Sequence, residues 1–101
     1  MKPPDFSQHR DAIEALCQEF GVRRLSVFGS ALTPEFGPES DIDLLVEFFP
    51  GTRLGLRFFT LEIRLSEVFG RKVDLNTEGF LSPPIRKHAL ATAKVQYEAA
   101  A

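Results

Sequence analysis

The sequence has few of the residues that mark several common classes of protein. Only one of its 101 residues is a cysteine, Cys17, so the chain cannot form an internal disulfide. Its two histidines, His9 and His88, lie far apart and have no cysteine partners, which argues against a zinc site. With no secretory signal either, we expect a protein of the reducing cytoplasm.

Long apolar runs and an excess of basic charge are also missing. No apolar run approaches the roughly 20 residues that span a bilayer, so we expect no membrane segment. Lys and Arg number 12 against 14 Asp and Glu, a formal charge of −2, whereas a general nucleic-acid binder would show a basic excess. A nucleotide bound through a metal ion remains compatible with this acidic balance, because the cation lies between carboxylates and phosphate.

The composition is otherwise that of a folded domain. Hydrophobic residues make up 44% of the chain, and phenylalanine supplies 10 of the aromatic residues, most of them expected in the core. The length is typical of one domain, so we expect residues 1–101 to form a single unit.

Hydrophobic periodicity predicts an α/β (α+β) fold, a small mixed sheet with helices packed against it. Asp5 and Gln8 resemble a capping box at the start of the first helix, and Gly21 and Gly70 follow helical segments that they can end. Strands 22–28 and 41–49 form either a hairpin across the long loop 30–40 or a parallel pair. The predicted helices are 5–20, 54–69 and 83–92, and the predicted strands are 22–28, 41–49, 72–76 and 94–98.

Asp41 and Asp43 are the strongest candidates for a chemical role. Residues two apart in a strand point to the same face, so both carboxylates project together while Ile42, Leu44 and Val46 face the other way. Carboxylates this close repel and raise each other's pKa unless a cation lies between them, which suits Mg²⁺. The alternative is an Asp that makes a turn at the strand entry and a second Asp that faces water.

Asp74 is a third carboxylate, placed between two apolar residues of a short strand. Burying a charge there is costly unless the group is paired, bound to metal or at a sheet edge facing water. If strands 41–49 and 72–76 are neighbours, Asp74 joins Asp41 and Asp43. The three carboxylates then hold two metal ions about 3.5–4 Å apart, the arrangement used for in-line displacement at phosphorus.

Gly29 and Ser30 follow the first strand, where the backbone must turn sharply. Ser30 offers a hydroxyl and a backbone N–H to phosphate oxygens, although a lone Gly-Ser pair is more often an ordinary turn. The pair gains meaning from its position, ten residues before Asp41-Ile42-Asp43.

The segments 27–30, 40–46 and 73–75 together resemble the minimal nucleotidyltransferases, small relatives of the DNA polymerase β superfamily. The resemblance covers nearly the whole chain. It implies that Gly29 and Ser30 bind the triphosphate, that Asp41 and Asp43 bind Mg²⁺, and that Asp74 binds metal and helps deprotonate an attacking hydroxyl.

The resemblance also implies a reaction and a partner. The reaction passes a nucleoside monophosphate, AMP from ATP, to an acceptor hydroxyl and releases pyrophosphate. Family members of this kind are often antitoxins paired with HEPN-domain toxins, and some modify a tyrosine of the toxin. One departure is the loop after Gly29, where Thr33-Pro34 replace the Arg-Gly of many relatives. The loop thereby loses a basic phosphate contact and gains rigidity.

Two other functions compete with catalysis by this chain alone. The first is a non-catalytic antitoxin that neutralises its partner by contact. The second is the nucleotide-binding subunit of a two-subunit transferase that acts on a small molecule.

Several other side chains have more ordinary interpretations. The basic residues Arg23, Arg24, Arg86 and Lys87 lie at element ends, where solvation is commoner than phosphate binding. Tyr97, the single tyrosine, is expected to pack in the last strand. The dense aromatic pairs 48–49 and 58–59 cannot all face inward, so some of these phenylalanines are candidates for a partner interface.

Overall fold

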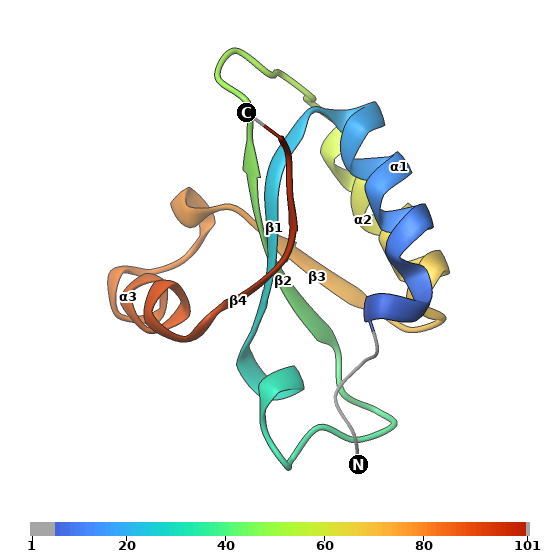
Figure 1. The fold of residues 1–101 in the computed structure, drawn as a ribbon. Coiled ribbons are helices and arrows are strands. Elements are labelled where there is room, and N and C mark those ends of the chain that lie inside the picture. Colours follow the sequence, from blue (N-terminus) through green and yellow to red (C-terminus); the bar gives the residue numbers. More distant parts are fainter. Residues whose placement is uncertain (1–5, 101) are drawn as a thin grey trace.

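The computed structural model describes residues 6–100 and shows a four-stranded sheet with helices on both faces (Figure 1). The predicted α/β class is confirmed. Three short 3-10 turns, η1 (Phe6–His9), η2 (Gly29–Leu32) and η3 (Glu78–Phe80), join the larger elements. The helices are α1 (Arg10–Phe20), α2 (Arg57–Phe69) and α3 (Pro83–Thr92), and the strands are β1 (Val22–Phe28), β2 (Ile42–Phe48), β3 (Val73–Asn76) and β4 (Lys94–Glu98).

The strands lie in the order β3-β2-β1-β4. β1 pairs antiparallel with both β2 and β4, so the hairpin interpretation of the first two strands is the correct one. β2 pairs parallel with β3, and the connection between them contains α2. The sheet is therefore mixed, as expected, and β3 is an edge strand beside the strand that carries Asp43.

The two faces of the sheet are covered unequally. α1 and α2 pack side by side against one face and enclose the main core, which contains alternate residues of β2 (Figure 1). A much smaller core joins the other face to α3 and consists of Phe28, Leu45, Leu81 and Ala89. The second face thus has room for polar side chains beside a thin apolar layer.

The first two helices begin later than predicted, whereas α3 spans the predicted residues 83–92. The first helical segment is divided into η1 and α1, and Asp5 of the proposed capping box lies outside the described residues. α2 begins at Arg57 instead of residue 54, because Gly55 just before it has a left-handed φ of 56°. Gly21 and Gly70 end their helices in the left-handed conformation, as predicted.

In each pair of adjacent phenylalanines, one ring packs inward and the other is exposed. Phe48 and Phe58 pack against the main core, while Phe49 and Phe59 are 43% and 55% exposed. Phe59 belongs to a row of exposed side chains at helical spacing with Leu56 and Ile63. We call Leu56, Phe59 and Ile63 the apolar stripe of α2.

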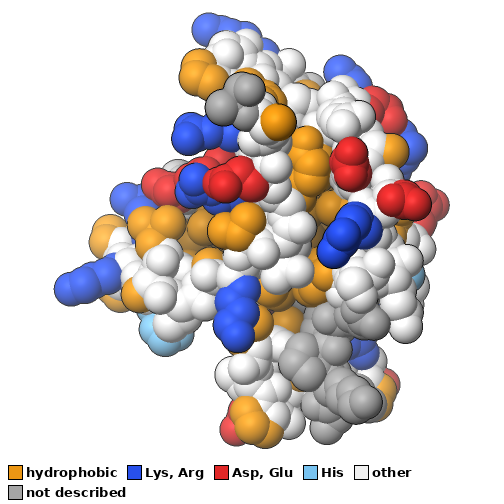
Figure 2. Space-filling model, in the orientation of Figure 1, with side chains coloured by type: hydrophobic (Ala, Val, Ile, Leu, Met, Phe, Trp, Pro, Cys, Tyr) orange, Lys and Arg blue, Asp and Glu red, His pale blue; other side chains and the backbone are white. Residues whose placement is uncertain are grey.

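The surface charges are mixed. On the face shown in Figure 2, acidic and basic side chains alternate and no broad basic area appears. None of the helices within residues 6–100 is long and apolar enough to cross a membrane.

Candidate functional site

The pairing of β2 with β3 brings two of the predicted carboxylates together. Asp43 and Asp74 are direct partners in the parallel register, and on the other side of β2 Asp43 pairs with Phe28. Ile42 and Leu44, the neighbours of Asp43 in sequence, are fully buried in the main core. Because side chains alternate along a strand, the Asp43 carboxylate lies on the opposite face, which α3 covers only in part.

The electrostatics of Asp43 show that the carboxylates interact. Burial first, then the negative charges of Asp74 and Asp41 and a hydrogen bond with Asp74, raise the pKa of Asp43 to about 6. The predicted repulsion among these groups is therefore present. Asp74 is exposed on the edge strand β3. It therefore both faces water at a sheet edge and lies beside Asp43, the two positions that the sequence suggested for it.

Asp41 lies one residue before β2 and is only partly buried. Its Oδ2 is 3.8 Å from Nζ of Lys72, the residue before β3. An exposed ion pair of this kind adds little stability. Its effect is local, since Lys72 places one positive charge at the edge of an otherwise acidic cluster.

The backbone at Gly29 lies so close to the carboxylate of Asp43 that only glycine fits there. Its φ of 76° is left-handed, a conformation that favours glycine. A Cβ at this position would lie 2.6 Å from Asp43 Oδ2, closer than such atoms approach. The Gly29-Ser30 turn therefore begins directly beside the carboxylate, so the structure brings Gly29, Asp43 and Asp74 together.

The turn after Gly29 is held closed by Thr33. Both the backbone N–H and the hydroxyl of Thr33 donate to the Ser30 carbonyl, at 3.0 and 2.9 Å. The rigidity expected of Thr33-Pro34 therefore has a structural cause. Thr33 offers no cation to a phosphate, which leaves the Ser30 hydroxyl and the backbone as the polar groups of this turn.

Arg71 fixes the rest of the loop, a role that sequence analysis did not assign to it. Its guanidinium lies 4.3 Å from the ring centroid of the buried Phe36 and donates to the carbonyls of Gly37 and Pro38, each at 2.9 Å. The available signal was Phe36, the one aromatic residue in a loop with two prolines, a glycine and no clear period. An aromatic residue there indicates an anchor, and Arg71 is its partner.

The other candidates lie away from this site or have structural partners. Arg24 forms ion pairs with Glu47 and Glu98, at 3.3 and 2.7 Å. Arg86 donates to the carbonyls of Glu78 and Leu81 and so ties η3 to α3.

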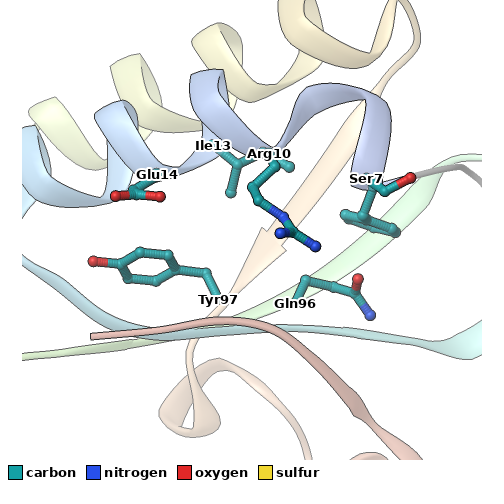
Figure 3. Close-up of a pocket in the computed structure, with 7 residues that line it drawn as sticks. Ser7, Arg10, Ile13, Glu14, Gln96 and Tyr97 are labelled. Carbon is teal, nitrogen blue, oxygen red and sulfur yellow. The ribbon is translucent and has the colours of Figure 1, made fainter. Parts of the chain in front are cut away.

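Tyr97 lines a cavity of about 130 Å³ between α1 and β4. In Figure 3, Arg10, Ile13 and Glu14 point from α1 toward Tyr97 and Gln96. This cavity adjoins the main core, on the face of the sheet opposite Asp43. Tyr97 packs against that core, as expected of a residue in the last strand.

The carboxylates suit a metal ion, although they do not form a closed set of ligands. Within residues 6–100 no three His, Cys, Asp or Glu side chains are already grouped as a metal-binding cluster. The oxygen donors of Asp41, Asp43 and Asp74 are those that Mg²⁺ prefers, and a cation would relieve the repulsion on Asp43. Binding of two ions by these residues stays a prediction.

Comparison with known proteins agrees with this geometry. Residues 9–95 match the model of the family described as "Nucleotidyltransferase domain". The chain belongs to this family. It is similar to "Protein adenylyltransferase MntA" of Thermococcus cleftensis, with 40% identity over 75 residues that cover 74% of this chain and 75% of the relative. A Methanocaldococcus jannaschii protein named "Putative protein adenylyltransferase MJ0128" is also 40% identical over 75 residues, which cover 74% of this chain and 76% of that protein.

Solved structures place this nucleotidyltransferase among the minimal ones. A structure described as a "putative minimal nucleotidyltransferase" matches with a TM-score of 0.74 and 35% identity, covering 93% of this chain and 95% of the other. A toxin–antitoxin structure with AMP-PNP has a TM-score of 0.69 and 20% identity, covering 89% of this chain and 73% of its own, and shows a shared fold. The family predicted from the sequence is confirmed.

Replacing Gly29 by alanine should damage the site more than the fold. The new methyl group collides with a flexible carboxylate, so Asp43 moves aside. We expect about 10–100-fold slower nucleotidyl transfer and a loss of about 1–2 kcal/mol in the free energy of unfolding. Gly51→Ala is the matched control, because Gly51 has a φ of 86° and nothing within 4 Å of the added carbon. Equal activities of the two variants would contradict this account.

The charge repulsion on Asp43 should appear as a pH-dependent stability. The pKa of Asp43 is about 6 in the folded chain, above its ordinary value of 3.8, so raising the pH between these values favours the unfolded state. Without metal, Asp43→Asn should therefore raise the free energy of unfolding at pH 7.5 by about 1 kcal/mol, after allowance for screening by water. Chemical denaturation measures this, and the gain should shrink toward zero near pH 4. A variant less stable than wild type at pH 7.5 would argue against carboxylate repulsion.

Proposed function

We propose that this nucleotidyltransferase moves AMP from ATP to a tyrosine hydroxyl of a HEPN-domain partner and thereby acts as its antitoxin. The observation that carries the proposal is the convergence of Asp43, Asp74 and the Gly29-Ser30 turn. Further support comes from the relatives, which are named protein adenylyltransferases, and from related folds solved as MntA–HepT toxin–antitoxin complexes.

In the proposed reaction, the Gly29-Ser30 turn and Asp74 have separate roles. The Ser30 hydroxyl and the backbone of the Gly29-Ser30 turn bind the triphosphate. Asp74, which is exposed at the sheet edge, accepts the proton of the attacking hydroxyl. The hydroxyl oxygen forms a bond to the α-phosphorus, the bond from that phosphorus to the bridging oxygen breaks, and pyrophosphate leaves with the electron pair.

Mg²⁺ is the cofactor that the donor set fits. Asp41, Asp43 and Asp74 would hold it, in two ions if the family arrangement applies, and it would supply positive charge against the triphosphate. Because Gly29 has no side chain, the Asp43 carboxylate has the space that it needs beside the turn.

The acceptor hydroxyl must reach the carboxylate of Asp74, which is exposed at the sheet edge. The cavity at Tyr97 opens on the face of the sheet away from the carboxylates. A protein partner that presents a hydroxyl to the exposed side of Asp74 meets this requirement.

A non-catalytic antitoxin is the second candidate, and the Thr33-Pro34 loop is the observation that favours it. The turn closed by Thr33 has no arginine to neutralise a phosphate. In that case the chain protects by contact alone. A nucleotide-binding subunit that completes a small-molecule transferase is the third candidate.

Transfer of labelled AMP to the HEPN partner separates these candidates. With ATP and Mg²⁺ we expect labelling of the partner, and at least about a hundredfold loss in Asp41→Asn and in Asp43→Asn, because each removes a charge from the metal site. Glu35→Gln, an exposed acidic residue in the loop between Ser30 and Asp41, is the control and should label normally. Labelling that persists in both aspartate variants would refute the site. Aspartate variants that still protect cells would favour the non-catalytic antitoxin.

The apolar stripe of α2 is the surface that we assign to the partner. Its side chains repeat at the spacing with which helices pack together, and a HEPN domain is all-helical. We expect Phe59→Asp to weaken the complex at least about tenfold in a binding titration, because it places a charge in an apolar contact. Leu90→Asp on α3, at a residue 51% exposed, is the control and should bind normally. Unchanged association of the Phe59 variant would exclude this surface.

A further inference from the structure

The outer edge of β3 is occupied by two side chains of α2. Glu62 Oε2 accepts a hydrogen bond from the Leu75 N–H at 2.8 Å, and Ser66 Oγ accepts one from the Val73 N–H at 3.0 Å. An edge strand normally exposes such donors to water or to another chain. Here both donors that flank Asp74 are bound by the protein itself.

The geometry of the helix and the strand explains why these two contacts fit together. Glu62 and Ser66 are one helical turn apart, a rise of about 6.0 Å, and Leu75 and Val73 are two strand residues apart, about 6.6 Å. The earlier helix residue, Glu62, contacts the later strand residue, Leu75, because α2 runs antiparallel to β3. Ser66 also donates its hydroxyl to the Glu62 carbonyl at 2.9 Å, which orients the oxygen that receives the Val73 N–H.

Asp74 needs such support because its strand is short and at the edge. β3 has four residues, and the sheet holds it on one side only, through β2. The negative charges of Asp43 and Asp74 repel across that pairing. A charged acceptor such as Glu62 forms a stronger hydrogen bond to a backbone N–H than a neutral group does, so it opposes the separation well.

We propose that Glu62 and Ser66 are positioning residues that hold β3 from its outer edge and so keep Asp74 opposite Asp43. This inference rests on the proposed role of Asp74 as a metal ligand. Glu62 acts through the Leu75 N–H and does not touch substrate. This role explains why the Glu62 carboxylate is partly buried and accepts a hydrogen bond from the backbone of β3.

The test compares Glu62→Ala with Glu62→Gln, which keeps one acceptor oxygen. Glu67→Ala, at an exposed acidic position on the same helix, is the matched control. We expect the Leu75 amide to exchange with deuterium fastest in Glu62→Ala, at an intermediate rate in Glu62→Gln, whose neutral oxygen is a weaker acceptor, and at the wild-type rate in Glu67→Ala. Mn²⁺ affinity, measured by calorimetry without nucleotide, should fall about 10–100-fold in Glu62→Ala, the usual effect of losing a group that orients a ligand.

A double-mutant cycle separates positioning from a general effect on folding. In the Asp74→Asn background, Glu62→Ala should cause little further loss of Mn²⁺ affinity, because the ligand that it positions is already gone. Equal losses in both backgrounds, or Glu62→Gln failing as badly as Glu62→Ala, would overturn the proposal.

Two outcomes with the wild-type chain distinguish this inference from the proposed function. Wild type that binds Mn²⁺ but transfers no AMP overturns the proposed function alone. Wild type that binds no Mn²⁺ overturns the positioning role together with the metal site.

Discussion

The parallel pairing of β2 with β3 is the contact on which the site depends. It sets Asp43 beside Asp74, and the energy that holds the two strands together must exceed the repulsion between these carboxylates. That energy comes from the opposite face, where Ile42, Leu44, Val73 and Leu75 are buried with α2. Asp43 and Asp74 are thus each flanked in sequence by buried apolar residues, which fix the direction of the carboxylate.

The loop between Gly29 and Asp41 is held next to the paired carboxylates by several contacts. Gly29 has no side chain where Asp43 requires the space, and Thr33 closes the turn on Ser30. Arg71 binds the far part of the loop through Phe36 and two carbonyls, and it is adjacent to Lys72, which approaches Asp41. The start of β3 therefore holds both the loop and the entry of β2.

Much of this arrangement follows from local pattern in the sequence. The alternation of Asp43 with the buried Ile42 and Leu44 follows from the two-residue period of a strand, although Asp41 lies just outside β2. Gly21 and Gly70 mark helix ends by their conformational freedom. The sequence does not determine which strand pairs parallel with β2, because pairing between distant strands depends on the whole chain. The contacts of Glu62 and Arg71 were missed for the same reason: each joins residues that no sequence period relates. The start of α2 was placed three residues early, since Leu54 fits the apolar pattern but Gly55 interrupts the helix.

The central claim is that Asp43 and Asp74 share a metal ion beneath the Gly29-Ser30 turn. Anomalous diffraction from crystals grown with Mn²⁺ and a non-hydrolysable ATP analogue tests it directly. The account predicts a manganese peak between these two carboxylates, with the triphosphate against the Gly29-Ser30 turn. An ordered nucleotide bound elsewhere, with no manganese at Asp43 and Asp74, would contradict it.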